Sequence, residues 1–317
     1  MKIYRGISSV DDSLRGAVLS VGNFDGVHLG HQRILRTAHA LSRVSSAAVV
    51  AMTFEPHPIA ILRPAESPPR LTPWEEKAHQ LERVGVDAVI RLDTDWPLLS
   101  LSAEDFVRQI LVKRIHPSYI VEGPNFGFGR GRAGNVETLQ SLASKGGFQV
   151  RVVEPYRLAM PDGTHIIVSS TVVRGALATG DVEHAARCLG RPYALVGRVV
   201  HGAGAGKKLG FPTINLEVGD QLVPAEGVYA GWVEVAGMRR PAAISIGRRP
   251  TLTSGEESPL VIEAFVLDES GDWYAESARL ELVERLRGQV RFDSREALTE
   301  QIGQDVERVR AMAQVAT

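Results

Sequence analysis

The stretch SVGNFDGVHLGHQRIL, from Ser20 to Leu35, joins an apolar run to an amphipathic one through a glycine-rich turn. Residues 17–22 (AVLSVG) predict a buried strand, and residues 30–44 carry apolar side chains at helical spacing. A helix that begins near Gly30 offers free backbone N–H groups and a partial positive charge at its first turn. The stretch therefore predicts a strand, a turn and a helix whose N-terminus can hold a phosphate group.

Strand and helix patterns alternate through the first half of the chain. Four more apolar runs predict buried strands, at residues 47–54, 87–92, 118–123 and 148–154. Helical patterns lie between them at residues 72–85 and 102–115, and in the second Ser102 and Asp105 are spaced as an N-terminal cap. This alternation predicts an α/β domain with a parallel, Rossmann-like sheet covered by helices on both faces. Ligands of such sheets bind beyond the carboxyl ends of the strands.

The pattern changes after about residue 190 to β-rich runs separated by Gly, Pro and Asp. The runs are residues 191–202, 227–237, 238–247, 260–268 and 278–286, and one helical pattern follows at residues 294–314. This order predicts an antiparallel β-barrel closed by a C-terminal helix. We therefore expect two domains, residues 1–186 and residues 187–317.

Composition limits the partners of the protein. The 317 residues are 44% hydrophobic and 23% charged, and the net charge of −1 argues against a broad basic surface for nucleic acid or membrane. We expect neither as a partner, and a weak homo-oligomer stays open. Cys188 is the single cysteine, which excludes an internal disulfide and fits a cytoplasmic location. The first residues show no apolar signal-peptide core, and no apolar run reaches membrane-spanning length.

Two histidines, His28 and His31, stand three residues apart at the predicted helix start. Their ring N–H groups can donate to phosphate oxygens and stabilise charge on a phosphorus atom under attack. The alternative is half of a metal site, for which His57 is the only nearby third ligand and no cysteine pair exists. We therefore favour phosphate. The turn matches neither the dinucleotide fingerprint G-x-G-x-x-G nor the P-loop.

Two motifs together resemble the nucleotidyltransferase superfamily, whose members transfer a nucleotidyl group from a triphosphate and release pyrophosphate. HLGH (residues 28–31) resembles the H-x-G-H motif, and VSSTVVR (residues 168–174) resembles I-S-S-T-x-x-R. The second motif predicts another helix start, where hydroxyl groups and the Arg174 guanidinium, one turn along, can meet phosphate.

Further motifs resemble the prokaryotic bifunctional riboflavin kinase/FAD synthetase family. They are TFEPHP (residues 53–58), RLT and EEK (within 70–77), LSAEDFV (101–107) and GPNFGFGRGRAGN (123–135). The resemblance implies that FMN attacks the α-phosphorus of ATP. It implies ATP contacts from Gly22, Asn23, Phe24, His28, His31, Ser169, Ser170, Thr171 and Arg174. It implies flavin contacts from Phe54, Pro56, His57, Pro58, Asn125, Phe126 and Phe128.

The β-rich half begins with VVHGAGAGKKLGFPTINL (residues 199–216). Its alternate glycines and two lysines suit a flap over phosphates, and a simple glycine-rich hairpin is the alternative. GFPTINL resembles the G-x-P-T-x-N segment of riboflavin kinases, which implies that Thr213 and Asn215 hold Mg²⁺ and phosphate. VIEAFVLD resembles the family segment with the catalytic base, which implies that Glu263 is the base. Nucleotide and flavin contacts are implied for Gly202, Gly204, Gly206, Lys207, Gly210, Phe211, Pro212 and Arg291.

The second half also departs from the family pattern. Phe265 replaces a usual His, Ser245 a usual Asn and Leu252 a common Phe, and residues 286–292 lack a usual acidic residue. The resemblance therefore implies that riboflavin, FMN and ATP are the substrates, with Mg²⁺ as cofactor, FAD as the product and an altered flavin affinity in the kinase. The alternatives are a monofunctional FAD synthetase with a weak or inactive kinase module, and a non-catalytic flavin-binding regulator. The intact histidines and Glu263 speak against the regulator.

Overall fold

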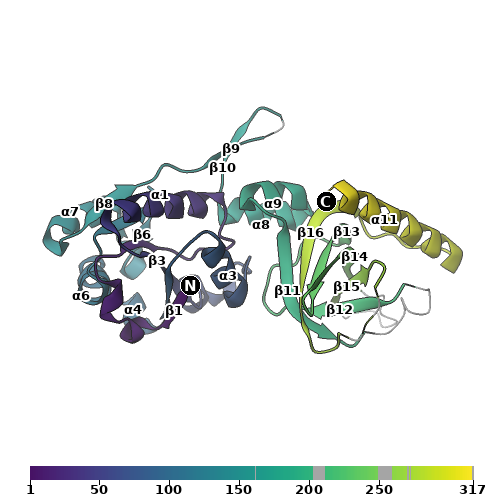
Figure 1. The fold of residues 1–317 in the computed structure, drawn as a ribbon, viewed down its shortest axis with the longest axis horizontal. Coiled ribbons are helices and arrows are strands. Elements are labelled where there is room, and N and C mark those ends of the chain that lie inside the picture. The colour runs from purple at the N-terminus through teal and green to yellow at the C-terminus, as the bar shows by residue number, and fades with distance from the viewer. Residues whose placement is uncertain (161, 203–210, 249–258, 270, 272, 316–317) are drawn as a thin grey trace. The chain divides into compact units, whose positions relative to one another are not determined.

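The computed structural model describes residues 1–160, 162–202, 211–248, 259–269, 271 and 273–315 of the chain. The chain divides by packing into two units, Met1–Ser169 and Ser170–Thr317, which are described separately (Figure 1).

The first unit is built on a six-stranded parallel sheet with the strand order β1-β4-β3-β2-β5-β8. The strands are β1 (Lys2–Arg5), β2 (Val18–Val21), β3 (Val49–Glu55), β4 (Ala88–Asp93), β5 (Tyr119–Glu122) and β8 (Gln149–Val152). This confirms the predicted parallel α/β fold. Strand β1 was not predicted, because only one of its four residues, Tyr4, is buried.

Helices cover both faces of this sheet, because strand side chains alternate between the faces. On one face Ala51 and Val89 pack with residues of α1 (Leu29–Ser45) and α3 (Trp74–Arg83). On the other face Met52 and Ile90 pack with the continuous helical segment of residues 103–115. That segment comprises α5 (Ala103–Asp105), the π-helix η4 (Phe106–Val112) and α6 (Lys113–Ile115), and α7 (Val136–Gly146) lies on the same face.

The predicted helix cap at Ser102 is confirmed. Its Oγ accepts a hydrogen bond from the Asp105 backbone N–H at 3.0 Å and donates to the Asp105 carboxylate at 2.8 Å. The remaining elements of this unit are short. They are η1 (Ile7–Ser9), η2 (Asp12–Leu14), α2 (Pro58–Leu62), η3 (Pro64–Glu66), α4 (Trp96–Leu99), β6 (Gly127–Phe128), η5 (Arg130–Arg132), β7 (Gly134–Asn135), β9 (Arg157–Ala159) and β10 (His165–Ile167).

The second unit begins with α8 (Ser170–Thr179) and α9 (Val182–Leu189) and continues as a closed barrel with the strand order β11-β12-β15-β14-β13-β16 (Figure 1). Neighbouring strands are antiparallel. The strands are β11 (Tyr193–Val200), β12 (Thr213–Glu217), β13 (Gly227–Val235), β14 (Met238–Arg248), β15 (Leu260–Val266) and β16 (Ser277–Arg287). The predicted barrel and its C-terminal helix, α11 (Arg295–Val315), are confirmed.

A buried ion pair helps to fasten α11 to the barrel. The Arg287 guanidinium at the end of β16 donates to the Asp305 carboxylate, with an Nη2–Oδ2 distance of 2.7 Å and an Nε–Oδ2 distance of 3.1 Å. Asp305 is only 3% exposed, and its neighbours Val306 and Val309 pack in the cluster that includes Phe265. The pair therefore fixes the helix that covers one outer side of the barrel.

We expect Arg287→Ala to lower the free energy of unfolding by about 3–5 kcal/mol, because the substitution leaves a buried carboxylate without its cation. Chemical denaturation followed by circular dichroism measures the change. Arg310→Ala is the control, since its ion pair with Asp268 is exposed and contributes little. Equal effects of the two substitutions would contradict the stabilising role of the Arg287–Asp305 pair.

The predicted boundary between residues 186 and 187 differs from the division by packing, which follows Ser169. Hydrogen bonds join α8 to the barrel, from the Ala225 N–H to the Leu177 carbonyl at 3.0 Å and from Arg285 to the Thr179 carbonyl at 3.1 Å. The boundary at 186/187 stays a prediction.

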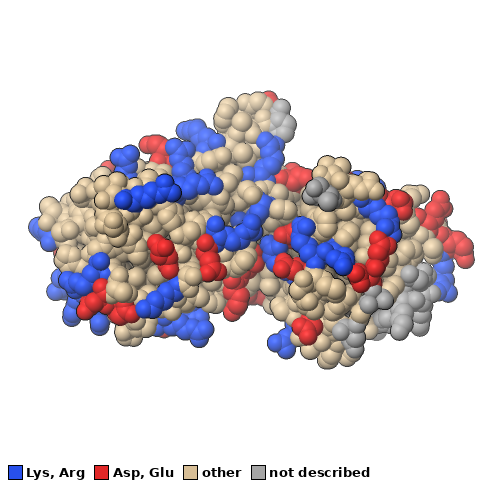
Figure 2. Space-filling view, in the orientation of Figure 1, with Lys and Arg blue, Asp and Glu red and all other residues tan. Residues whose placement is uncertain are grey.

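The last two features of the fold are the distribution of charge on its surface and the polarity of its helices. Acidic and basic side chains lie interspersed on the face shown in Figure 2. Among the described residues, no helix combines the length and apolar character needed to span a membrane.

Candidate functional site

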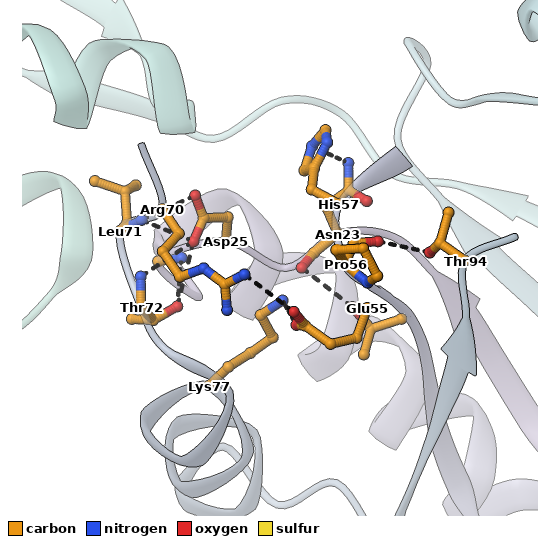
Figure 3. A network of polar contacts seen from close by, with 12 residues as sticks. Asn23, Asp25, Glu55, Pro56, His57, Arg70, Leu71, Thr72, Lys77 and Thr94 are labelled. Atoms are coloured by element: carbon orange, nitrogen blue, oxygen red, sulfur yellow. Dashed lines mark hydrogen bonds and ion pairs between the residues drawn. The ribbon is translucent and has the colours of Figure 1, made fainter. Parts of the chain in front are cut away.

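The turn after β2 is held in place by a segment 46 residues further along the chain (Figure 3). The Asp25 carboxylate accepts hydrogen bonds from the backbone N–H groups of Leu71 at 3.0 Å and Thr72 at 3.1 Å. Phe24 and Val27 have φ angles of 48° and 41°, in the left-handed region that costs energy for residues other than glycine. The Asp25 contacts therefore support a strained turn at the start of α1.

The two histidines of this turn lie against each other. His28 caps α1, and its Nδ1 accepts a hydrogen bond from the His31 N–H at 3.3 Å, so in the neutral ring Nε2 carries the proton. The rings stack with centroids 3.7 Å apart, and the Phe24 ring meets His31 edge-on. Burial lowers the pKa of His31 well below its usual value, and His28 and Lys77 lower it further. His31 is therefore neutral at pH 7.

Gly30 separates the two histidines because a side chain at this position would collide with one of them. A Cβ atom at Gly30 would lie 3.0 Å from the His28 ring and 3.3 Å from the Val168 carbonyl oxygen. Such contacts are tighter than ordinary van der Waals distances, so the His28 ring would have to move.

We expect Gly30→Ala to reduce the FMN adenylylation that the motifs imply, by less than the roughly 10²-fold that a misplacement of a positioned group by about 1 Å can cost, because the His28 ring has to move by only a few tenths of an ångström. Gly303→Ala in α11 is the control, since a Cβ at that position meets no described atom within 4 Å beyond its chain neighbours and the backbone of its own helix. Steady-state rates of FAD formation from FMN measure both. A Gly30→Ala enzyme with the wild-type rate would show that the His28 position is not critical.

A first cavity of about 260 Å³ opens at the N-terminus of α1. Seven of the predicted ATP or flavin residues line it directly: Gly22, Phe24, His28, His31, Asn125, Phe126 and Ser169. Its apolar wall includes Val153, Pro155 and Val168. His31 Nδ1 is buried there and has no hydrogen-bond partner in the described part of the chain. A ligand with polar groups at the helix end and an apolar ring fits this arrangement.

The predicted ATP residues that do not line the first cavity lie in two other places. Asn23 lines the second cavity described below. Ser170, Thr171 and Arg174 lie in the first turns of α8, directly after Ser169 in the chain, as the helix-start prediction required.

A second cavity of about 330 Å³ adjoins the first through the shared residues Val21, Gly22, Asn125 and Phe126. The predicted flavin residues on its wall are Phe54, His57, Pro58, Asn125, Phe126 and Phe128. Pro56 is not among the lining residues, and its carbonyl accepts a hydrogen bond from Thr94 at 2.6 Å. The wall also contains Ile59, Leu62 and Leu98, which no motif marked. The cavity is therefore a largely apolar space suited to a planar ring.

Polar contacts fix the ends of β2 and β3 beside these cavities (Figure 3). The Glu55 carboxylate accepts a hydrogen bond from Arg70 at 3.1 Å and lies 3.9 Å from the Lys77 ammonium group. Burial lowers the pKa of Lys77, while the charges of Glu55 and Asp25 oppose this change. Asn23 lies 2.8 Å from the His57 ring. The motif segments around residues 23, 55 and 70–77 are thus one connected network.

Two of the predicted kinase residues, Asn215 and Glu263, face each other on neighbouring strands of the barrel. Strand register places Asn215 of β12 opposite Glu263 of β15, and Ser245 of β14 opposite Glu263 on its other side. Thr213 is two residues from Asn215 and shares its face. A Cβ atom at Gly202 would lie 2.1 Å from the Asn215 amide, so only glycine fits there.

The remaining predicted kinase residues lie at separate places or outside the described residues. The Phe211 ring meets Phe265 edge-on at 5.2 Å, and Pro212 directly precedes β12. Arg291 is exposed between β16 and α11. Gly204, Gly206, Lys207, Gly210 and Leu252 lie outside the described residues.

Comparison with known proteins assigns a family to each unit. Residues 10–171 match the FAD synthetase family, and residues 189–313 match the riboflavin kinase family. The bifunctional riboflavin kinase/FMN adenylyltransferase of Escherichia coli K12 is 36% identical over 309 residues, covering 96% of each chain. The protein of the same name from Pseudomonas fluorescens is 37% identical, covering 99% of this chain and 98% of the relative.

A solved structure shares the whole fold. A Streptococcus pneumoniae protein, called Macrolide-efflux Protein in its crystal structure, superposes with a TM-score of 0.86 at 29% identity. The superposition covers 98% of this chain and 99% of that chain. Together, the two family matches and the full-length relatives show that the chain belongs to the bifunctional riboflavin kinase/FMN adenylyltransferase family.

Proposed function

We propose that the protein phosphorylates riboflavin to FMN with ATP and then adenylylates FMN with a second ATP to give FAD and pyrophosphate. The observation that carries this proposal is that each matched family coincides with its own cluster of polar residues. One cluster surrounds His28 and His31 in the first unit, and the other surrounds Asn215 and Glu263 in the second.

In the adenylylation step, an FMN phosphate oxygen attacks the α-phosphorus of ATP. The bond between this phosphorus and the bridging oxygen breaks, and pyrophosphate leaves. The first turn of α1 supplies backbone N–H groups, and His28 supplies its Nε2–H, to the negative charge that develops on the phosphoryl oxygens. His31 is neutral, so it acts as a hydrogen-bonding group rather than as a fixed cation.

In the kinase step, the riboflavin 5′-hydroxyl attacks the γ-phosphorus of ATP, and ADP leaves. Glu263 accepts the hydroxyl proton. Thr213 and Asn215 offer a hydroxyl and an amide oxygen, which are hard donors of the type that Mg²⁺ takes together with substrate phosphates. Within the described residues the Asn215 side chain has no hydrogen-bond partner, so its oxygen is available. A bound Mg²⁺ would neutralise charge on the phosphates.

A single assay separates this function from its alternatives. The protein is incubated with riboflavin and MgATP, and riboflavin, FMN and FAD are resolved by chromatography. FAD formed from riboflavin supports the proposal. FAD formed only from supplied FMN indicates a monofunctional FAD synthetase, and the absence of both products indicates a flavin-binding regulator.

The proposal also includes two separable modules in the cytoplasm, divided at 186/187. The single cysteine fits that location. Residue 187 lies in the last turn of α9, so fragments that begin at residue 170 and at residue 187 should be compared. A fragment of residues 187–317 that is folded by circular dichroism and makes FMN supports the boundary; an unfolded fragment contradicts it.

A further inference from the structure

The floor of the first cavity contains a carboxyl group that the proposed adenylylation does not use. Glu122 is the last residue of β5, is 4% exposed, and lines the cavity together with His28 and His31. A buried carboxyl group beside a site for a polyanion requires an explanation, because an ionised carboxylate would repel the phosphates.

Glu122 lies where two neighbouring strands separate. In the described register, β2 and β5 pair at Val18 with Tyr119 and at Leu19 with Ile120, and pairing ends there. The Val21 N–H instead donates to Glu122 Oε1 at 2.5 Å. The side chain thus replaces a strand carbonyl at the point where the sheet opens, which is where parallel sheets bind ligands.

The two carboxyl oxygens of Glu122 have different surroundings. Oε1 accepts the bond from Val21 and a longer one, 3.5 Å, from the Ser20 hydroxyl. Oε2 has no hydrogen-bond partner among the described residues. Burial raises the pKa of Glu122 well above its usual value, although the bonds from Val21 and Ser20 act in the opposite direction. Since Oε1 accepts both bonds, Oε2 is the oxygen that can carry the proton in the neutral form.

We propose that Glu122 is a nucleotide-binding residue whose Oε2 hydroxyl donates a hydrogen bond to an acceptor atom of bound ATP. This inference rests on the proposed function, which places ATP in the first cavity. A neutral Glu122 adds a donor to the cavity floor without adding a negative charge. Ionised Glu122 loses the donor and repels the triphosphate, so ATP binding requires the protonated form.

Other titratable groups line the same cavity and must be separated from Glu122 in any pH experiment. In the described part of the chain they are His28, which caps α1, His31 in its first turn, and Glu154 and Tyr156 from the segment after β8. The test therefore compares enzymes that differ in whether residue 122 can ionise, while the other titratable groups of the cavity stay the same.

The test is the pH profile of kcat/KM for ATP in FAD formation from saturating FMN, measured with the full-length enzyme between pH 6 and pH 10. This reaction reports only the first site, because the kinase does not use FMN as a substrate. Above the pKa of Glu122, the wild-type value should fall about tenfold per pH unit. Glu122→Gln keeps a donor and an acceptor but cannot ionise, so its profile should lack this fall. Glu137→Gln, on the exposed first turn of α7, is the matched control and should retain it.

The outcomes are distinguishable. A Glu122→Gln profile identical to that of the wild type overturns the inference and leaves the proposed function intact. A wild-type enzyme that makes no FAD from FMN at any pH overturns both. A second test needs no variant: carbon-13 NMR of wild-type protein labelled at its glutamate carboxyl groups reports the protonation of each glutamate directly. A glutamate carboxyl group that titrates well above the usual glutamate pKa and shifts on ATP addition supports the inference; the absence of such a group, or one that does not respond to ATP, overturns it.

Discussion

His31→Ala should reduce FAD formation from FMN by about 10²–10³-fold while FMN formation from riboflavin continues at the wild-type rate. The substitution removes a neutral, partly buried ring that lies on His28 and borders the first cavity. Loss of one positioned donor at a phosphorus under attack has an effect of this size. Supplied with riboflavin and MgATP, the variant should therefore accumulate FMN, which chromatography measures directly.

His79→Ala is the matched control for this prediction. His79 is an exposed histidine of α3 in the same unit, so its removal should leave both reactions unchanged. Thermal unfolding of each variant separates a chemical effect from damage to the fold. If His31→Ala stops FMN formation as well, at an unchanged melting temperature, the assignment of adenylylation alone to the first unit is wrong.

Glu263→Gln should reduce FMN formation from riboflavin by about 10²–10⁴-fold, the range attributed to general base catalysis. Glutamine preserves the size of the side chain on β15 and its position opposite Asn215, but it cannot accept the hydroxyl proton. FAD formation from supplied FMN should remain near the wild-type rate, because that reaction uses the other unit.

Glu234→Gln is the control here, since Glu234 is an exposed glutamate on β13 of the same barrel. It should leave the kinase unaffected. If the Glu263→Gln enzyme phosphorylates riboflavin at the full rate, Glu263 is not the general base and another group must accept the proton.

The architecture could be predicted from the sequence because it depends on local periodicity. The buried strands β2, β3 and β4 are apolar runs, and the barrel strands lie between turn residues. Segments without such a pattern were missed. Strand β1 has one buried residue, and the hairpin of β9 and β10 has strands of three residues with no buried side chain.

The site was predictable only in part, because motifs mark residues but not their long-range contacts. HLGH identified His28 and His31, yet nothing local indicates that Asp25 binds the backbone 46 residues away. Glu122 ends an apolar run and resembles an ordinary strand end, so its position on a cavity floor required the fold. Ile59, Leu62 and Leu98 became recognisable only where the chain brings them to one wall.

The central claim is that two reactions occur at two sites, each in its own unit. The most direct test mixes equal amounts of His31→Ala and Glu263→Gln with riboflavin and MgATP and follows FAD. Each variant alone should form almost no FAD from riboflavin. In the mixture, FMN released by His31→Ala becomes the substrate of the intact first unit of Glu263→Gln, so FAD should form. If FMN accumulates in the mixture and no FAD appears, the two residues do not serve independent sites and the claim is contradicted.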